Sequence, residues 1–139
     1  MEIQDSFSLI MNQCSFTNIT MQVNLINMVY SNLSISNFTL NFLISKINFH
    51  IYPYYSNLSV DALSYSNFFP GCFYIEAGSF VLNNSIFTNS SSFNNILVYL
   101  STAIYATESM NLGFYIEKTE FSNLNSLDND GGGVKLLCV

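Results

Sequence analysis

The sequence contains no arginine and no tryptophan, and its only strongly basic residues are Lys46, Lys118 and Lys135. The formal net charge is −6, and only 9% of the residues are charged. A surface that binds nucleic acid neutralises phosphates with clustered Lys and Arg, and docking on anionic lipid needs the same cations. The composition therefore argues against both partners, and we predict no nucleic-acid interface.

Cysteine is also scarce, and the three cysteines Cys14, Cys72 and Cys138 lie far apart. Zinc knuckles and redox pairs need two cysteines separated by only a few residues. We therefore interpret all three as small buried hydrophobic residues. The sequence predicts no metal site and no cofactor.

The sequence has neither a signal-peptide pattern nor a long apolar run. It opens with Met1-Glu2-Ile3-Gln4-Asp5, whereas a signal peptide begins with a basic region, so a secreted form would need a start further upstream. The most apolar run, residues 96–106, has about half the length that spans a bilayer. We predict no transmembrane helix here, and a membrane anchor would have to lie outside the given chain.

Glycine-rich turns between strands, typical of hairpin proteins, are nearly absent. Apolar and polar residues alternate from Phe7 to Ile51, which predicts short strands. The alternation slips at adjacent polar residues, such as Thr17-Asn18 and Ser36-Asn37. A two-residue slip lets the backbone turn a corner while the next side chain still points inward. This pattern predicts a chain that coils around one core, a β-solenoid.

A short motif of an aromatic residue, Ser or Thr, and Asn recurs along the chain and predicts its corners. It occurs at residues 16–18, 30–32, 55–57, 65–67, 87–89 and 121–123. Asn tolerates the left-handed conformation, and its amide can bond the equivalent residue of the next coil. Stacked rows of this kind stabilise parallel strands in register. The predicted corner residues are Asn18, Asn32, Asn57, Asn67, Asn89 and Asn123.

The whole chain, 1–139, is predicted to form a single all-β domain of roughly six coils, either complete or a fragment of a longer solenoid. Both prolines lie in segments that we interpret as loop excursions, near 52–56 and 68–72, because proline cannot donate to a strand ladder. The best helical candidate, Thr102 to Asn111, lacks a strong apolar stripe.

The segment Phe121 to Val134 joins one such corner to a glycine run, and Phe73-Tyr74-Ile75-Glu76 returns at residues 114–117. This segment resembles the repeats of right-handed parallel β-helix, or pectin-lyase-like, proteins. It is particularly similar to the FxxN and GGAI repeats of chlamydial polymorphic outer-membrane proteins, and to stretches of Asn-, Ser- and Phe-rich surface proteins of ciliates. The resemblance implies a right-handed parallel β-helix.

The resemblance also raises the question of catalysis, because pectin-lyase-like folds include lyases and hydrolases of acidic polysaccharides. Such enzymes use a basic residue with calcium held by several Asp, or grouped carboxylates. This chain has a single histidine, His50, and no strand with several Asp. Lys118 lies between Glu117 and Glu120, which we interpret as a solvated strand face. We predict no catalytic residue, and we place His50 on the surface.

The oxygen-bearing residues from Ser126 to Gly131 resemble the first half of a calcium-binding loop. Leu137 stands where the closing bidentate Glu is needed. We therefore interpret the segment as an Asp, Asn and Gly turn, without a metal.

Two sets of residues are candidates for surface functions. Six sequons give candidate glycosylation sites at Asn18, Asn32, Asn37, Asn57, Asn83 and Asn89. Several coincide with corners, where the amide is instead available for stacking between coils. A candidate platform for a sugar or a partner protein consists of Tyr52, Tyr54, Tyr55 and Tyr65, unless these rings only seal a loop over the coils.

These patterns favour a non-enzymatic structural or adhesive β-helix segment of a cell-surface or secreted protein. It would bind other proteins or glycans through a flat face and associate with itself through uncapped ends. The alternative is a carbohydrate-active or carbohydrate-binding pectin-lyase-like protein whose catalytic part is absent or decayed. A third reading is a degenerate fragment with no independent role.

Overall fold

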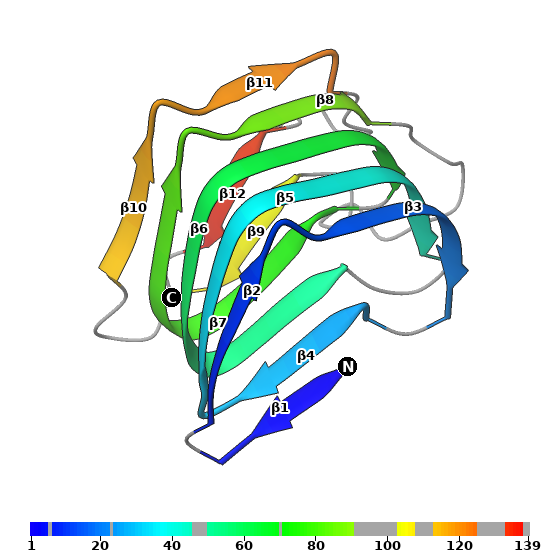
Figure 1. Ribbon diagram of the computed structural model, residues 1–139. Helices are drawn as coiled ribbons and strands as arrows, with labels where there is room; N and C mark the ends of the chain where they lie inside the picture. The colour runs from blue at the N-terminus through cyan, green and yellow to red at the C-terminus, as the bar shows by residue number, and fades with distance from the viewer. Residues whose placement is uncertain are drawn as a thin grey trace.

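The computed structural model describes residues 1–5, 7–22, 24–45, 50–69, 71–90, 103–107, 113–124 and 133–137 (Figure 1). All twelve regular elements in these ranges are β-strands, so the predicted all-β class is confirmed. None of these ranges contains a helix that could cross a membrane.

The strands follow one another along the chain and differ widely in length. They are β1 (Glu2–Gln4), β2 (Ser8–Asn12), β3 (Ser15–Met21), β4 (Ile26–Val29), β5 (Asn32–Ser45), β6 (Ile51–Phe69), β7 (Phe73–Asn83), β8 (Ile86–Ser90), β9 (Ile104–Thr107), β10 (Gly113–Glu117), β11 (Glu120–Ser122) and β12 (Val134–Leu137). The longest, β5 and β6, bend at corners and so serve two or three faces of the coil (Figure 1).

Every strand pair is parallel, and the pairing builds three faces around one core. Face A follows the order β1-β4-β6-β7-β9-β12. Face B contains β2 and β10 with the matching parts of β5, β6 and β7, and face C contains β3, β8 and β11 with the matching parts of β5 and β6. The chain winds in a right-handed sense (Figure 1). The predicted right-handed parallel β-helix is therefore confirmed.

The described strands cross face A six times, once for each strand of that order. Five coils therefore separate β1 from β12, slightly fewer than the roughly six expected from a coil of a little over 20 residues. Successive coils are offset by 25 residues where Leu33 pairs with Leu58, and by 22 where Leu58 pairs with Phe80. In-register pairing at these offsets brings equivalent side chains into rows.

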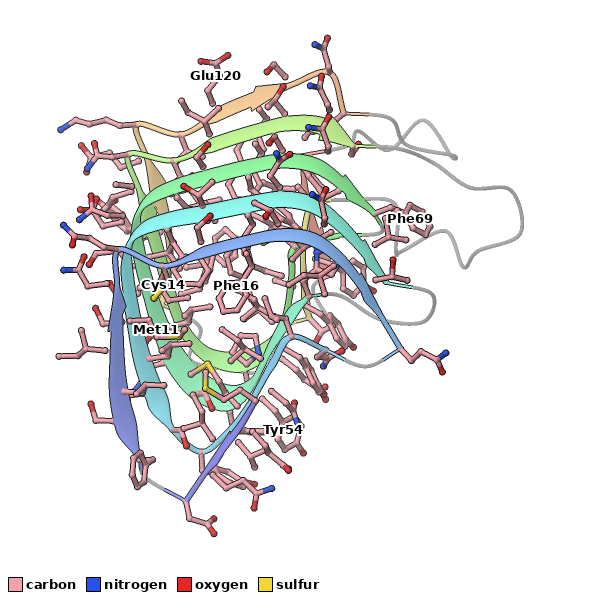
Figure 2. All side chains as sticks on the ribbon, turned by 45° about the vertical axis from the view of Figure 1, so that its right-hand side comes forward. Met11, Cys14, Phe16, Tyr54, Phe69 and Glu120 are labelled. Atoms are coloured by element: carbon pink, nitrogen blue, oxygen red, sulfur yellow. The ribbon has the colours of Figure 1, made fainter. Side chains whose placement is uncertain are left out.

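The core consists of these inward rows, in which aliphatic residues are interspersed with large aromatic ones. Figure 2 shows Met11, Cys14 and Phe16 of the first coil pointing inward. Large side chains that are fully buried include Phe38, Phe68, Phe73, Phe80 and Phe87. Each such burial contributes about 1.5–3 kcal/mol, so the rows supply the main stabilisation of the coil.

The corners are marked by residues with positive φ, which fall into three rows. The first row contains Asp5, Tyr30, Tyr55 and Ala77; the second contains Gln13, Asn37, Ala62, Asn84 and Lys118; the third contains Asn18, Asn67, Asn89 and Asn123. Left-handed backbone at equivalent positions lets each coil turn where the previous coil turned. Four of the six predicted corner asparagines therefore have the expected conformation.

The other two predicted corners, at Asn32 and Asn57, contain the same tripeptide, but there the backbone turns at its first residue instead of at its asparagine. There Tyr30 and Tyr55 take the left-handed conformation, and the asparagines begin the next straight segment. The amide Nδ2 of Asn57 still donates to Oδ1 of Asn32 over 2.8 Å, and Oγ of Ser79 donates to Oδ1 of Asn57 over 2.7 Å. The predicted amide ladder exists, although these two residues are not the left-handed ones.

One other expectation about local structure is wrong, and the weak helical candidate, which was not predicted to be a helix, contains a strand. Residues 52–56 are not a loop excursion, because β6 runs through them, and Pro53 is buried on face A. The helical candidate contains β9, with Ile104 buried. Near the second expected excursion, Phe68 and Phe69 belong to β6, Gly71 and Cys72 are buried, and Pro70 lies outside the described residues.

Candidate functional site: the outer tyrosine face

Tyrosine side chains gather on the outside of face A because of the strand alternation. In β6, Ile51 and Pro53 point into the core, so Tyr52 and Tyr54 point outward. Parallel register then places the outward residues of β7 and β9 in the same rows. We define the tyrosine face as Tyr30, Tyr52, Tyr54, Tyr55, Tyr74 and Tyr105; the last of these is buried, with 7% exposure, at the far end of the row.

Three of these rings form a row that runs along the solenoid axis, and two of them are stacked. The ring centroids of Tyr52 and Tyr74 are 5.1 Å apart with an interplanar angle of 8°. The centroids of Tyr74 and Tyr105 are 5.3 Å apart at 42°. One face of the Tyr52 ring is therefore packed against one face of the Tyr74 ring.

The other three rings form a cluster at the adjoining corner. The Tyr54 and Tyr55 centroids are 4.7 Å apart at 77°, and those of Tyr30 and Tyr54 are 6.1 Å apart at 72°. Tyr30 and Tyr55 are 5.7 Å apart at 31°, and their side chains are 55% and 46% exposed. Figure 2 shows Tyr54 on the outer side of the coils. This cluster is the most exposed part of the tyrosine face.

The carboxylate of Glu76 is hydrogen-bonded to the tyrosine face. The hydroxyl of Tyr52 donates a hydrogen bond of 2.6 Å to Oε2 of Glu76. Burial raises the pKa of the Tyr52 phenol, and the bond to Glu76 and its negative charge raise it further. Tyr52 is therefore a neutral hydrogen-bond donor at physiological pH, and it fixes the position of the Glu76 side chain.

The fourth residue of the predicted platform, Tyr65, does not belong to this face. Its side chain is 0% exposed and stacks on Phe68, with centroids 4.3 Å apart at 15°. Tyr65 lies on face C, where the aromatic residue of the corner motif points inward. Its hydroxyl has no hydrogen-bond partner among the described residues.

His50 also differs from the prediction, because it is fully buried instead of exposed. Its ring lies edge-on to Tyr65 with centroids 5.6 Å apart, and its Nε2 is 3.0 Å from the carbonyl oxygen of Phe69. Burial lowers the pKa of His50 to about 3. This neutral imidazole lies inside the core, where it is inaccessible to a substrate.

The platform prediction missed Tyr30, Tyr74 and Tyr105. A usable signal was present, because Tyr30 precedes Tyr55 by one coil offset of 25 and Tyr52 precedes Tyr74 by an offset of 22. Alignment of the chain at these offsets brings the tyrosines into rows. The corner motifs alone do not reveal that alignment.

The remaining site predictions have mixed outcomes. Lys118 is an exposed, left-handed corner residue rather than part of a strand face, and its Nζ is 3.7 Å from Oε1 of Glu117. Cys72 is buried as expected, and Cys14 is partly buried. Cys138 and the Ser126–Gly131 segment lie outside the described residues. Within the described ranges, no three His, Cys, Asp or Glu side chains are grouped as metal ligands.

The candidate glycosylation residues differ in how their amides are used. Nδ2 of Asn37 donates to Asn12, and Nδ2 of Asn57 donates to Asn32. Oδ1 of Asn83 is buried without a partner among the described residues. Asn18, Asn32 and Asn89 are exposed. Asn32 and Asn89 accept hydrogen bonds through Oδ1, from Asn57 and Asn123, and no hydrogen bond joins the Asn18 amide to another described residue.

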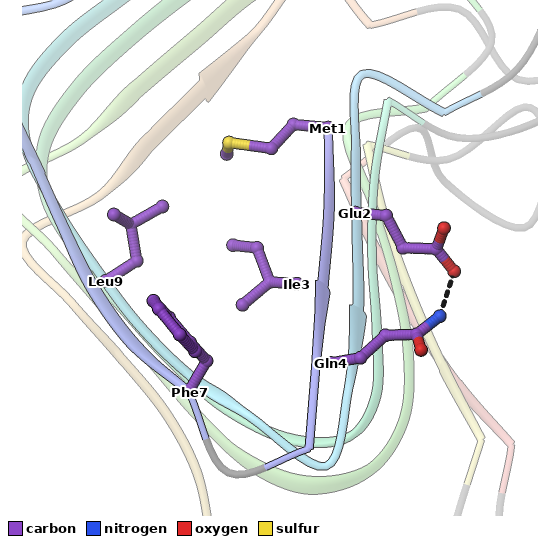
Figure 3. Close-up of a pocket in the computed structure, with 6 residues that line it drawn as sticks. All are labelled: Met1, Glu2, Ile3, Gln4, Phe7 and Leu9. Atoms are coloured by element: carbon purple, nitrogen blue, oxygen red, sulfur yellow. Dashed lines mark hydrogen bonds between the residues drawn. The ribbon is translucent and has the colours of Figure 1, made fainter.

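A cavity of about 290 Å³ lies at the N-terminal end of the coil (Figure 3). Met1, Ile3, Phe7 and Leu9 line it with apolar groups. Glu2 and Gln4 point to the other side of β1, where they hydrogen-bond to each other (Figure 3). The side chains that point into the cavity are apolar.

No family model, no curated protein and no solved structure matches this chain. The β-solenoid arrangement therefore rests on the strand pairing and register of the chain itself. The tyrosine face is the most distinctive surface in the described part of the molecule.

Proposed function

We propose that this chain is a non-enzymatic structural or adhesive β-helix segment that binds a partner protein through its tyrosine face. The observation that carries the proposal is the exposed cluster of Tyr30, Tyr54 and Tyr55 beside the Tyr52–Tyr74 stack. Tyrosine is enriched at protein interfaces because it combines a large apolar area with a hydrogen-bonding hydroxyl. Contiguous exposed aromatic surface of this kind typically marks an interaction site.

The geometry favours a protein over a glycan as the partner. Sugar rings stack on the flat faces of aromatic side chains, but Tyr52 and Tyr74 each use one ring face in their contact with each other, and Tyr54 meets Tyr55 edge to face. The net charge of −6 attracts cationic groups. Arg and Lys side chains of a partner also gain cation–π contacts with tyrosine rings. We therefore propose a partner surface that carries Arg or Lys.

The solenoid holds this face in one arrangement before a partner arrives. Tyr30 and Tyr55 are adjacent to the Asn32–Asn57–Ser79 ladder, in which each side chain is hydrogen-bonded to the next coil. The buried hydroxyl of Ser56 also accepts a hydrogen bond of 3.0 Å from the backbone N–H of Ser31. A preorganised surface loses less conformational entropy on binding.

We further propose a cell-surface or extracellular location, with any membrane attachment supplied by sequence outside the given chain. The proposal is supported by the sequence resemblance to pectin-lyase-like repeats of surface proteins and by the exposed sequon at Asn18. The carbohydrate-active alternative gains no support from His50, which is buried.

Binding to arrays of extracellular proteins and of glycans tests the proposed function. The double variant Tyr54→Ala/Tyr55→Ala should lose at least about tenfold in affinity for a protein ligand, because hot-spot aromatics contribute 2 kcal/mol or more. Tyr115→Ala is the matched control, because Tyr115 is 64% exposed on face B. Equal binding by both variants, or binding to glycans alone, would contradict the proposal.

The chain should also associate with itself through its ends. Among the described strands, β2 and β3 each pair only with β5, so their other edges are open. The apolar cavity beside Phe7 and Leu9 lies at the same end. Open edges with apolar neighbours are templates for another chain.

A further inference from the structure

We propose that Tyr30 and Tyr55 are a site of oxidative cross-linking, where a heme peroxidase with hydrogen peroxide couples the two rings into an intramolecular dityrosine. The link would join two successive coils covalently at the outer corner. It requires only the two phenols and a one-electron oxidant that reaches them from solvent.

The pair has the access and the proximity that this coupling needs. The side chains are 55% and 46% exposed, so an oxidant can reach both phenols. Parallel register places Tyr30 one coil before Tyr55, since Asn32 pairs with Asn57. The ring centroids are 5.7 Å apart at 31°, so the two rings are close neighbours with a moderate tilt between their planes. Both residues occupy the same left-handed corner, at φ values of 48° and 46°.

The neighbouring tyrosines are less suited to the same reaction. Tyr54 meets Tyr55 and Tyr30 at 77° and 72°, so one ring presents its edge to the face of the other. Tyr52 lies face to face with Tyr74 at 8°, and its hydroxyl is bonded to Glu76. Tyr65 is inside the core and inaccessible to an oxidant. The geometry therefore selects the Tyr30–Tyr55 pair.

The chemistry balances with one molecule of hydrogen peroxide. The peroxidase removes one electron and one proton from each phenol, which produces two tyrosyl radicals and reduces the peroxide to two molecules of water. The radicals combine through the Cε atoms beside the phenol oxygens, and one carbon–carbon bond forms. The hydrogen on each coupled carbon then moves to the phenol oxygen, so both hydroxyls are restored. The protein loses two hydrogen atoms in total.

The positions of the lysines in the sequence allow this cross-link to be detected by cleavage at lysine. Tyr30 is the only tyrosine before Lys46, and Tyr55 lies between Lys46 and Lys118. After oxidation of dilute protein with peroxidase and peroxide, cleavage at lysine separates fragments 1–46 and 47–118 unless a cross-link joins them. We expect the joined fragments in the monomer fraction, lighter by two hydrogen atoms than their sum, with dityrosine fluorescence. Fragmentation mass spectrometry should place the bond between Tyr30 and Tyr55.

Three variants decide the outcome. Tyr30→Phe and Tyr55→Phe keep the ring but lack the phenol, so each should reduce the joined fragments at least fivefold, with an unchanged far-ultraviolet circular dichroism spectrum. Tyr115→Phe removes an exposed tyrosine from face B and should leave the yield unchanged. The proposal is overturned if the wild-type monomer contains no joined fragments. A yield that survives Tyr55→Phe, or a bond mapped to Tyr54, would overturn it equally.

Discussion

At the residue scale, the tightest geometric requirement lies at Gly78. Its φ is +98°, and a Cβ atom built there would be 2.0 Å from the carbonyl oxygen of Ser56 in the preceding coil. The contacting atom belongs to the backbone of the neighbouring coil, so it cannot move without breaking the stack. Only glycine fits this corner.

We expect Gly78→Ala to lower the free energy of unfolding by about 3 kcal/mol or more, from the left-handed strain together with the clash. Urea unfolding followed by circular dichroism measures the change. Gly113→Ala is the control, because a Cβ there meets the Cβ of Ser79 at an ordinary 3.6 Å. A similar loss of stability in both variants would contradict the close approach.

A second prediction separates the two contributions of a corner asparagine. Asn67 has a φ of 53°, and its Nδ2 donates a 2.8 Å hydrogen bond to Oδ1 of Asn41. Asn67→Gly still adopts the left-handed conformation without strain but loses the hydrogen bond, so it should lower the free energy of unfolding by about 1 kcal/mol. Asn67→Ala removes both and should cost about 2–3 kcal/mol. Equal unfolding free energies for the two variants would mean that the left-handed preference of Asn adds nothing here.

The third prediction concerns His50 and pH. Its pKa is about 3 in the folded chain, against 6.5 for the unperturbed group, so between these values the unfolded chain binds the extra proton. Stability is therefore full above about pH 6.5 and falls toward pH 3, by up to about 1.4 kcal/mol per pH unit. His50→Gln removes this titration while keeping an amide donor for the carbonyl of Phe69. Its unfolding free energy should fall less steeply than that of wild type between about pH 6 and 4. Parallel profiles for the two proteins would show that His50 does not titrate in this way.

At the element scale, the alternation of apolar and polar residues predicts the strands, but it fails at one corner. There, two consecutive residues point into the core in successive coils: His50 with Ile51, Cys72 with Phe73, and Ala103 with Ile104. The N–H of His50 donates to the carbonyl of Gly71, and that of Ile51 to the carbonyl of Cys72. Strict alternation, counted back from the inward-pointing Ile51, therefore predicts that His50 points to solvent, whereas its side chain is buried.

The corner motif is ambiguous for a similar reason. In residues 16–18 and 87–89 the aromatic side chain enters the core and Asn turns the corner, whereas in residues 30–32 and 55–57 the aromatic residue turns the corner. The tripeptide is compatible with both phases. Which residue of the tripeptide turns the corner depends on the side chains of the adjacent coil with which it must align. Ser31 and Ser56 are an example, because they are buried together although they lie a whole coil apart in the sequence.

At the scale of the whole molecule, the fold was more predictable than the functional surface. Inward rows recur because every coil must bury an apolar side in the same core, and this regularity is visible in one sequence. The tyrosine face depends on the exact offsets, 25 at Leu33–Leu58 and 22 at Leu58–Phe80, which the corner spacing alone did not establish. For that reason Tyr65 was grouped with the outer tyrosines although it belongs to the core.

The final prediction concerns the assembly of the 139-residue polypeptide when it is made alone. Its N-terminal coil combines open strand edges with an apolar cavity, and Phe7 beside this cavity is 64% exposed. We expect the mass measured by light scattering to rise with protein concentration, through end-to-end stacking. Phe7→Lys should lower that mass toward the monomer, since an edge lysine would have to bury its charge in the contact.

Tyr115→Lys is a closely matched control, because Tyr115 is also 64% exposed but lies on face B of a later coil. It introduces the same charge and should leave the concentration dependence unchanged. If both lysine variants reduce association equally, net charge is responsible and not the end of the coil. A wild-type polypeptide that remains monomeric at high concentration with native strand content would mean that the open edges are protected. In that case the coil end is not a template for another chain.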